Sequence, residues 1–307
     1  MKKGLVTTAV FVVVMLAVPT GAQENNEGGL LGDIPEGSRS APVHLMTLYD
    51  EQGFPVFADP NGSVPFSTRQ SCSVCHDYEK ISGGLHFNAT DSEAEAGRPG
   101  KPWIYWDCRS ATQIPLSYRD WPGTWSPDEL GLTDWQFTTI FGRQMPGGGP
   151  GEKGPEAPAD TRDRWELSGK LEINCLACHN THPGQDQAEY ARQIRKQNFK
   201  WAATASSELA TVDGSVRQLP AFYEPTDEPE LELPSAYYDT GRFDFDNQVL
   251  LDLVTDIPPR RCYFCHSTKP VGPAADQMWQ TDEDVHLKAG LTCVDCHRND
   301  VGHDMVR

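Results

Sequence analysis

The sequence predicts a mainly α fold with extensive irregular loops and few strands. Glycine and proline, with 27 and 24 of the 307 residues, make up about one residue in six, which is typical of a chain rich in turns. The clearest periodic segment is helical, and few segments can be read as strands. A hydrophobic fraction of 38% and a charged fraction of 23% fit a soluble protein rather than a bundle of membrane helices.

Residues 1–22 have the pattern of a secretory signal peptide. Two lysines open the chain, an apolar stretch spans 5–18, and Thr20 and Ala22 are small residues suited to a cleavage site. The apolar stretch is shorter than the roughly 20 residues of a membrane helix. The first cysteine is Cys72, so a lipid anchor on a processed N-terminal cysteine has no attachment atom. We expect a periplasmic or extracellular protein that does not span the membrane after cleavage; an uncleaved anchor is the alternative.

Residues 23–145 form the first predicted region of the mature chain. After a polar, glycine-rich opening, this region is irregular and contains an insertion dense in aromatic residues. One helix is expected there, beginning at Ser126 or Thr133 and running to about Gly142. Both starts have the spacing of a capping box, because Glu or Gln follows three residues later.

A linker and a second region follow. Residues 146–158 are rich in glycine and proline and predict a linker or long loop near the middle of the chain. The C-terminal region is 159–307. Its clearest element is a helix expected over 186–209, where apolar residues from Tyr190 to Ala205 fall on one stripe.

The charge of the chain argues against one class of partner. The formal net charge is −18, with 44 acidic against 26 basic residues. Nucleic acid is therefore not an expected partner, because nothing here neutralises phosphates. The acidic runs are interpreted as a solvated surface, with steering of a basic partner as the alternative.

The pattern Cys-x-x-Cys-His occurs four times. The copies are Cys72, Cys75 and His76; Cys175, Cys178 and His179; Cys262, Cys265 and His266; and Cys293, Cys296 and His297. Two thiols on one helical turn can each bond a vinyl-derived carbon of one porphyrin, and the next histidine then becomes the proximal iron ligand. The pattern is the attachment signature of c-type haem, so the sequence predicts four haem c groups.

Zinc knuckles and disulfides are the alternative interpretations. Two zinc sites would use all eight thiols but give no reason for a histidine after every pair. Disulfides within such pairs belong to redox enzymes with a βαβ pattern, and the sequence has no such pattern. Haem attachment is therefore the favoured interpretation.

On these four motifs the chain resembles the tetrahaem members of the multihaem c-type cytochromes, which are periplasmic or extracellular. The resemblance covers the motifs and their flanks and does not identify a subfamily. It implies a multihaem cytochrome c fold in which haems form much of the core, and a role in electron transport.

Four irons need eight axial ligands, of which the motifs supply four. The distal candidates are the remaining histidines, namely His44, His86, His182, His286 and His303. His182 follows His179 too closely to reach the opposite face of the same haem, so we expect it to serve another haem. The haems are therefore expected to be mainly bis-histidine, with no open position for a substrate.

Four methionines and the ninth cysteine are further candidate iron ligands, but other roles are favoured for them. Met46, Met145, Met278 and Met305 are available as ligands, but packing roles are favoured. Cys108 belongs to no motif and is expected to be a buried, reduced thiol among aromatic residues. The alternative is a thiolate iron ligand at a catalytic haem, with Arg109 lowering its pKa.

The predicted function is the relay of single electrons between respiratory redox partners, such as a membrane quinone-linked complex or a terminal reductase. One alternative is a multihaem oxidoreductase acting on a nitrogen or sulfur compound at one open or Cys-ligated haem. All four motifs end in histidine, which favours the carrier over the enzyme. A further alternative is a polymerising extracellular cytochrome wire, in which a histidine such as His44 is donated across a subunit contact.

Overall fold

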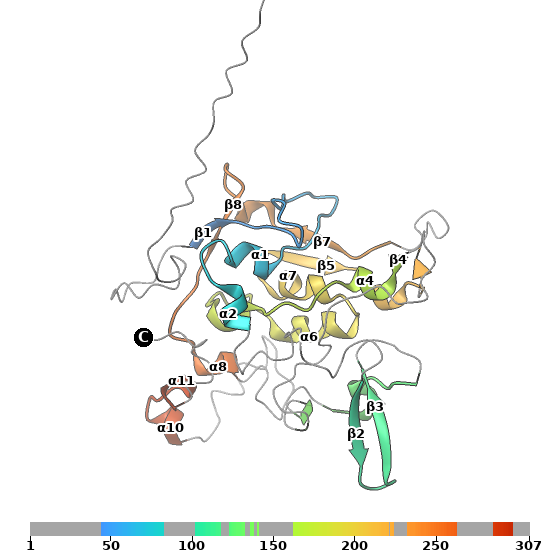
Figure 1. Ribbon diagram of the computed structural model, residues 1–307. Coiled ribbons are helices and arrows are strands. Elements are labelled where there is room, and N and C mark those ends of the chain that lie inside the picture. The colour runs from blue at the N-terminus through green and yellow to red at the C-terminus, as the bar shows by residue number, and fades with distance from the viewer. Residues whose placement is uncertain are drawn as a thin grey trace, which may run out of the picture.

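The computed structural model describes residues 44–82, 102–117, 123–132, 136–137, 140, 162–220, 222–223, 232–262 and 285–296. Within these ranges the chain is 35% helix and 21% strand. Short helices alternate with small antiparallel sheets (Figure 1). The prediction of a mainly α fold is therefore wrong. The predicted signal peptide, 1–22, and the predicted linker, 146–158, lie outside the described residues.

The helices are short. The α-helices are α1 (Thr68–Cys72), α2 (Tyr78–Ser82), α4 (Arg164–Ser168), α5 (Cys175–His179), α6 (Gln187–Arg195), α7 (Ala202–Ser206), α8 (Pro259–Cys262), α10 (Val285–Lys288) and α11 (Cys293–Cys296). The 3-10 helices are η3 (Pro127–Leu130), η4 (Phe199–Trp201), η5 (Val216–Gln218) and η6 (Thr240–Arg242). In the part of the chain that the structure describes, no helix is long and apolar enough to cross a membrane.

The described strands pair in twos, and every pair is antiparallel. The pairs are β1 (His44–Thr47) with β8 (Gln248–Leu251), β2 (Trp103–Asp107) with β3 (Thr112–Leu116), β4 (Arg162–Asp163) with β6 (Phe222–Tyr223), and β5 (Ala210–Asp213) with β7 (Ser235–Tyr238). In β5, the side chains of Ala210 and Val212 are buried while Thr211 and Asp213 are exposed, as expected for a strand with one buried face.

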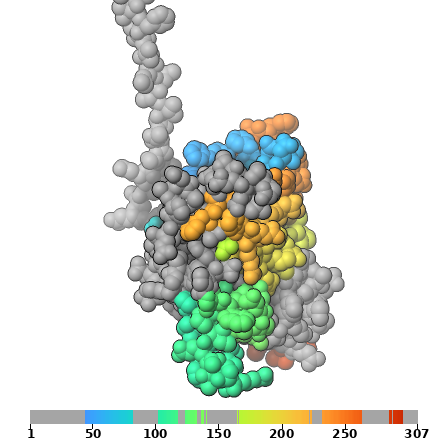
Figure 2. Space-filling view, turned by 90° about the vertical axis from the view of Figure 1, so that its right-hand side faces the viewer, coloured from blue at the N-terminus to red at the C-terminus, as the bar shows by residue number. Residues whose placement is uncertain are grey.

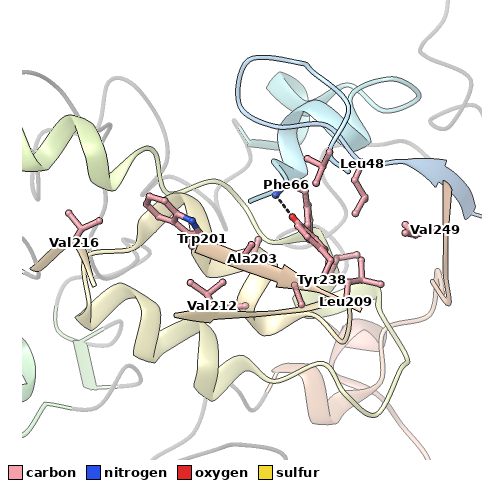
Figure 3. Close-up of a cluster of buried hydrophobic side chains, with 14 of the residues drawn as sticks. Leu48, Phe66, Trp201, Ala203, Leu209, Val212, Val216, Tyr238 and Val249 are labelled. Atoms are coloured by element: carbon pink, nitrogen blue, oxygen red, sulfur yellow. Dashed lines mark hydrogen bonds between the residues drawn. The ribbon is translucent and has the colours of Figure 1, made fainter. Parts of the chain in front are cut away.

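The main core consists of protein side chains. It forms around β5, β7 and α7, and α5, β8 and the segment before α1 pack at its edges (Figures 1 and 3). Its most deeply buried large members are Leu48, Val56, Phe66, Leu176, Leu209, Val216 and Val249. The prediction that haems form much of the core is therefore wrong for the described residues, because aliphatic and aromatic side chains fill this interior.

The predicted helix over 186–209 begins as expected but is interrupted. The carboxylate of Asp186 accepts a hydrogen bond from the backbone N of Ala188 at 2.9 Å and caps α6. The helix ends near Lys196 because Gln197 has a φ of +61°. The Asn198 side chain fixes this bend by donating to the Gln193 side chain at 2.7 Å, and η4 and α7 continue after it.

The aromatic-rich insertion contains a β-hairpin. Strands β2 and β3 form it, and Trp103 packs edge to face against Phe137 with ring centroids 5.0 Å apart. The predicted capping box at Ser126 is confirmed, but it begins only the single turn η3, because Gly131 with a φ of +70° ends that turn. Figure 2 shows the hairpin, in green, at one end of the molecule.

The Tyr238 hydroxyl joins two parts of the main core. It accepts from the backbone N of Phe66 at 2.9 Å (Figure 3). It also donates to the carbonyl oxygen of Val64 at 3.0 Å. Burial raises the pKa of this phenol above its ordinary value. The bonds tie the segment that leads into α1 to strand β7, so they support the position of Cys72.

We predict that Tyr238→Phe lowers the free energy of unfolding by about 1–2 kcal/mol, because the buried backbone N of Phe66 loses one of its acceptors and the carbonyl oxygen of Val64 loses its donor. Urea unfolding followed by circular dichroism measures this change. The matched control is Tyr237→Phe, at a neighbouring position that is 37% exposed, with an expected change within about 0.5 kcal/mol. Equal losses in the two variants would contradict the role assigned to the Tyr238 hydroxyl.

Candidate functional site

The first and second motifs, which the structure describes in full, each lie on a single helical turn. In the first motif, the backbone N atoms of Cys75 and His76 donate to the carbonyl oxygen of Cys72 at 3.1 and 3.0 Å. The second motif forms all of α5, from Cys175 to His179. The third begins at the last residue of α8, and the fourth begins with the first residue of α11. One turn is the arrangement that places two thiols along the edge of one porphyrin.

The first and second motifs meet through their leading cysteines. The thiols of Cys72 and Cys175 lie close enough to influence each other, although they are 103 positions apart in the sequence. The neighbouring Cys72 thiol, together with burial, raises the pKa of Cys175 well above its ordinary value. The thiol therefore stays protonated at neutral pH.

Glu172 connects the two motifs. Its carboxylate, on a side chain only 10% exposed, accepts from the Ser67 hydroxyl at 2.8 Å and from the backbone N of Arg69 at 3.0 Å. The Arg69 guanidinium completes the cluster at 3.4 Å. These donors belong to the first turn of α1, while Glu172 lies three residues before Cys175. The carboxylate therefore fixes the helix of the first motif beside the start of the second.

Two further hydrogen bonds strengthen the connection between the first and second motifs. The Thr68 hydroxyl donates to the carbonyl oxygen of Ile173 at 2.7 Å. The backbone N of Ile173 donates to the Tyr78 hydroxyl at 3.0 Å. Burial raises the pKa of Tyr78 above its ordinary value, so the phenol remains neutral. Ile173 is thus held from both sides by residues that flank the first motif.

A short backbone ladder joins the second motif to the segment before the third. The backbone N of Val254 donates to the carbonyl oxygen of His179 at 2.9 Å, and the backbone N of Thr181 donates to that of Asp252 at 2.8 Å. The His179 ring adds a bond from Nδ1 to the carbonyl oxygen of Val254 at 2.7 Å. Since a carbonyl only accepts, Nδ1 carries a proton, and in the neutral ring Nε2 then carries the lone pair, which is the tautomer of an iron-ligating histidine.

Arg261 makes a second connection between these two motifs. The side chain is buried and donates to the carbonyl oxygens of Asn180, His182 and Gln185 at 2.5, 3.3 and 3.4 Å. It lies directly before Cys262, so the loop after the second motif is fixed to the helix of the third. Its charge lowers the pKa of the Cys178 thiol, but burial dominates and raises that pKa to about 11.

The third and fourth motifs also meet through their leading cysteines. The thiols of Cys262 and Cys293 lie close enough to influence each other, and helices α8 and α11 are in contact. Burial, followed by the charge effects of Cys293 and Cys178, raises the pKa of Cys262 above its ordinary value. The Asp295 carboxylate accepts from the backbone N of Thr292 at 2.6 Å and so stabilises the first turn of α11.

Several predicted site residues lie outside the description. These are Cys265, His266, His297, His86 and His303, together with the side chain of Cys296. Of the described distal candidates, His44 lies in β1 opposite Leu251 of β8, and His286 is exposed in α10. His76 is partly buried directly after the turn of the first motif.

His182 is engaged in a different way from His179. Its Nδ1 accepts a hydrogen bond from the backbone N of Gly184 at 3.0 Å. Since an amide N–H only donates, the neutral ring carries its proton on Nε2. Ligation of an iron through Nε2 would therefore require this proton to leave or the bond to Gly184 to break.

Cys108 differs from its predicted environment. It lies in the turn of the β2–β3 hairpin and is exposed, so the expectation of a buried thiol is wrong. The Asp107 carboxylate holds this turn through the Ser110 hydroxyl and the backbone N of Arg109, and these bonds lower the pKa of Asp107. Figure 1 shows the hairpin well away from α8 and α11.

Glu172 and Arg261 were not identified from the sequence. Each is a charged residue within three positions before a motif, but its partners are hydroxyl and backbone groups distant in the sequence. Within the described ranges, no three side chains of His, Cys, Asp or Glu stand close enough together to hold a metal ion. No protein-family model, curated protein or solved structure matches the chain.

We predict that Glu172→Gln lowers the free energy of unfolding by about 1–3 kcal/mol, because an amide N–H₂ would face donors that now share a carboxylate. Chemical denaturation measures the loss. Glu166→Gln, at an exposed position of α4, is the matched control and should change the free energy by less than about 0.5 kcal/mol. A loss for Glu172→Gln no larger than that of the control would contradict the anchoring role of this carboxylate.

Proposed function

We propose that the protein is a tetrahaem c-type cytochrome that relays single electrons between redox proteins in the periplasm or outside the cell. The observation that carries this proposal is the set of four Cys-x-x-Cys-His motifs, of which the first and second, and the third and fourth, meet at their leading thiols. Sites that meet in this way would place their redox groups close together, as a relay requires.

The thiols fit haem attachment better than they fit zinc or disulfide exchange. A histidine follows every Cys pair, which haem attachment explains and two four-thiolate zinc sites or disulfides within the pairs do not. Attachment adds the S–H group across a vinyl double bond: sulfur bonds one carbon, the proton ends on the next carbon, and no oxidant is consumed. The iron of an attached haem accepts and returns one electron.

The proximal ligands are proposed to be His76, His179, His266 and His297. The Nδ1–H of His179 donates to the carbonyl oxygen of Val254, and this bond orients the ring and raises the basicity of Nε2. The distal ligands are proposed to come from His44, His86, His182, His286 and His303. Bis-histidine ligation leaves no iron position for a substrate, so the proposed activity is electron transfer rather than catalysis.

We do not propose a catalytic haem with a cysteine ligand, because Cys108 is exposed on a hairpin turn that lies away from α8 and α11 (Figure 1). The proposed partners are therefore redox proteins, with a membrane quinone-linked complex and a terminal reductase as the candidates on the two sides of the relay.

The proposal is tested by expressing the full chain in a host competent for cytochrome maturation. We expect a red protein whose intact mass exceeds that of the processed chain by four haems, with low-spin absorbance in the ferric state. Replacing both thiols of one motif by serine, as in Cys175→Ser with Cys178→Ser, should remove one haem. Cys108→Ser should leave the haem content unchanged.

A colourless product with an unmodified mass would contradict the proposal. So would zinc bound in place of iron, or a high-spin ferric spectrum together with turnover of a nitrogen or sulfur compound.

A further inference from the structure

We infer that the outer face of the β1–β8 ribbon is a docking surface for a protein whose own docking face has an apolar centre ringed by lysine or arginine. The surface consists of Leu45, Phe57, Phe245 and Leu250, which we call the apolar patch. The inference goes beyond the proposed electron relay, because it uses only described residues outside the four motifs. It therefore holds whatever group the motifs carry.

The strand pairing places two leucines on the solvent side of the ribbon. Leu45 of β1 lies opposite Leu250 of β8, and these residues are 48% and 57% exposed. Val249 and Leu251, on either side of Leu250, are buried in the main core. Successive side chains of a strand point to opposite faces, so Leu45 and Leu250 form an apolar pair on the outer face.

Two phenylalanines extend this pair. Val56 is buried in the main core, but the next residue, Phe57, is 62% exposed. Phe245 is fully exposed in the turn that leads into β8. The Asn247 side chain joins this turn to the segment of Phe57, because it donates to the carbonyl oxygen of Val56 at 2.8 Å. Figure 2 shows these blue and orange segments together, at the end of the molecule opposite the green hairpin.

The turn that carries Phe245 is held by hydrogen bonds. The Asp244 carboxylate accepts from the backbone N of Asp246 at 2.9 Å and from that of Gln248 at 2.8 Å. The backbone N of Asp244 donates to the carbonyl oxygen of Gln248 at 2.9 Å. A turn that is ordered before binding loses less conformational entropy when a partner covers it. Apolar side chains gathered on a surface in this way mark an interaction site.

The surroundings of the apolar patch are acidic. Segment 44–66 has three acidic residues and segment 235–256 has five, while Arg242 is the sole lysine or arginine of both segments. Arg242 is paired with Glu208 at 3.3 Å. Asp246 follows Phe245 directly, Asp252 lies two positions after Leu250, and both aspartates are exposed. An apolar centre with an acidic rim is complementary to an apolar centre with a basic rim.

The same charges disfavour two other occupants. A second copy of the chain would bring two acidic rims together, and like charges that meet at an interface oppose binding. A membrane surface with anionic lipids would repel the rim in the same way. We therefore assign the apolar patch to a basic protein partner, and a second copy and a lipid surface are outcomes that the test distinguishes.

The test uses the full chain and a short peptide in which lysine alternates with leucine. A second peptide, in which lysine alternates with serine, has the same charge without the apolar side chains. We expect isothermal titration calorimetry to show at least about tenfold tighter binding of the Lys-Leu peptide, because burial of apolar side chains adds to the electrostatic attraction. Added salt should weaken the binding, since it screens the acidic rim.

Substitutions then locate the binding surface. Leu250→Ser should weaken binding of the Lys-Leu peptide by about tenfold. Ile104→Ser is the matched control, because Ile104 is 47% exposed on the other ribbon, β2–β3, and it should leave the affinity unchanged. Asp246→Asn combined with Asp252→Asn should weaken the binding of both peptides and reduce its salt dependence. Glu166→Gln, at an exposed position of α4, should have a smaller effect on both.

Equal affinities for the two peptides, or equal losses in Leu250→Ser and Ile104→Ser, would overturn the docking surface. Self-association of the chain that Leu250→Ser abolishes would contradict the inference in favour of a second copy. Binding to phosphatidylcholine vesicles that the same substitution abolishes would contradict it in favour of lipid. A colourless product that still binds the Lys-Leu peptide would overturn the proposed function alone, so the two failures are distinguishable.

Discussion

The Glu172 carboxylate, held by the first turn of α1, is the constraint on which the rest of the site depends. It brings together two helical turns from distant parts of the chain and places Cys72 near Cys175. Two hydroxyls, a backbone amide and a guanidinium donate to this carboxylate, and charge-assisted hydrogen bonds of this kind are stronger than neutral ones. The junctions made by Arg261 and by Cys262 with Cys293 extend this arrangement to the other two sites.

The protein side chains form a core that supports this arrangement. Strands β5 and β7 and helix α7 make a base, and Leu176 of α5 and Phe66 before α1 pack into it. The attachment turns are thus fixed by aliphatic and aromatic packing close to the cysteines they carry. A side-chain core of this kind gives each thiol a defined position, whereas a chain held only by its cofactors would not.

The sequence predicts local features of the structure better than it predicts the fold. The start of the helix at Asp186 and the capping box at Ser126 are local patterns, and local patterns can be read directly. The strands are only two to five residues long, too short for alternation to stand out, so the sheets were missed. The left-handed Gln197 that interrupts the predicted helix depends on its tertiary surroundings, such as the buried Asn198 side chain.

The roles of Glu172 and Arg261 also depend on tertiary contacts, so the sequence did not predict them. Glu172 and Arg261 look like ordinary charged residues in the sequence, and only the fold brings hydroxyls, a backbone N–H or carbonyl oxygens within their reach. Cys108 was expected to be buried because aromatic residues surround it in the sequence, but these form a hairpin whose turn is exposed. In a two-stranded ribbon, the neighbours of a residue in the sequence do not predict whether its side chain is buried.

An experimental structure of the matured protein tests the central claim most directly. The account predicts a porphyrin bonded to each motif, with the sulfur atoms of Cys72 and Cys175 adjacent and those of Cys262 and Cys293 adjacent. A disulfide between Cys72 and Cys175, a single metal ion shared by those two thiols, or haems whose attachment edges lie far apart would contradict it.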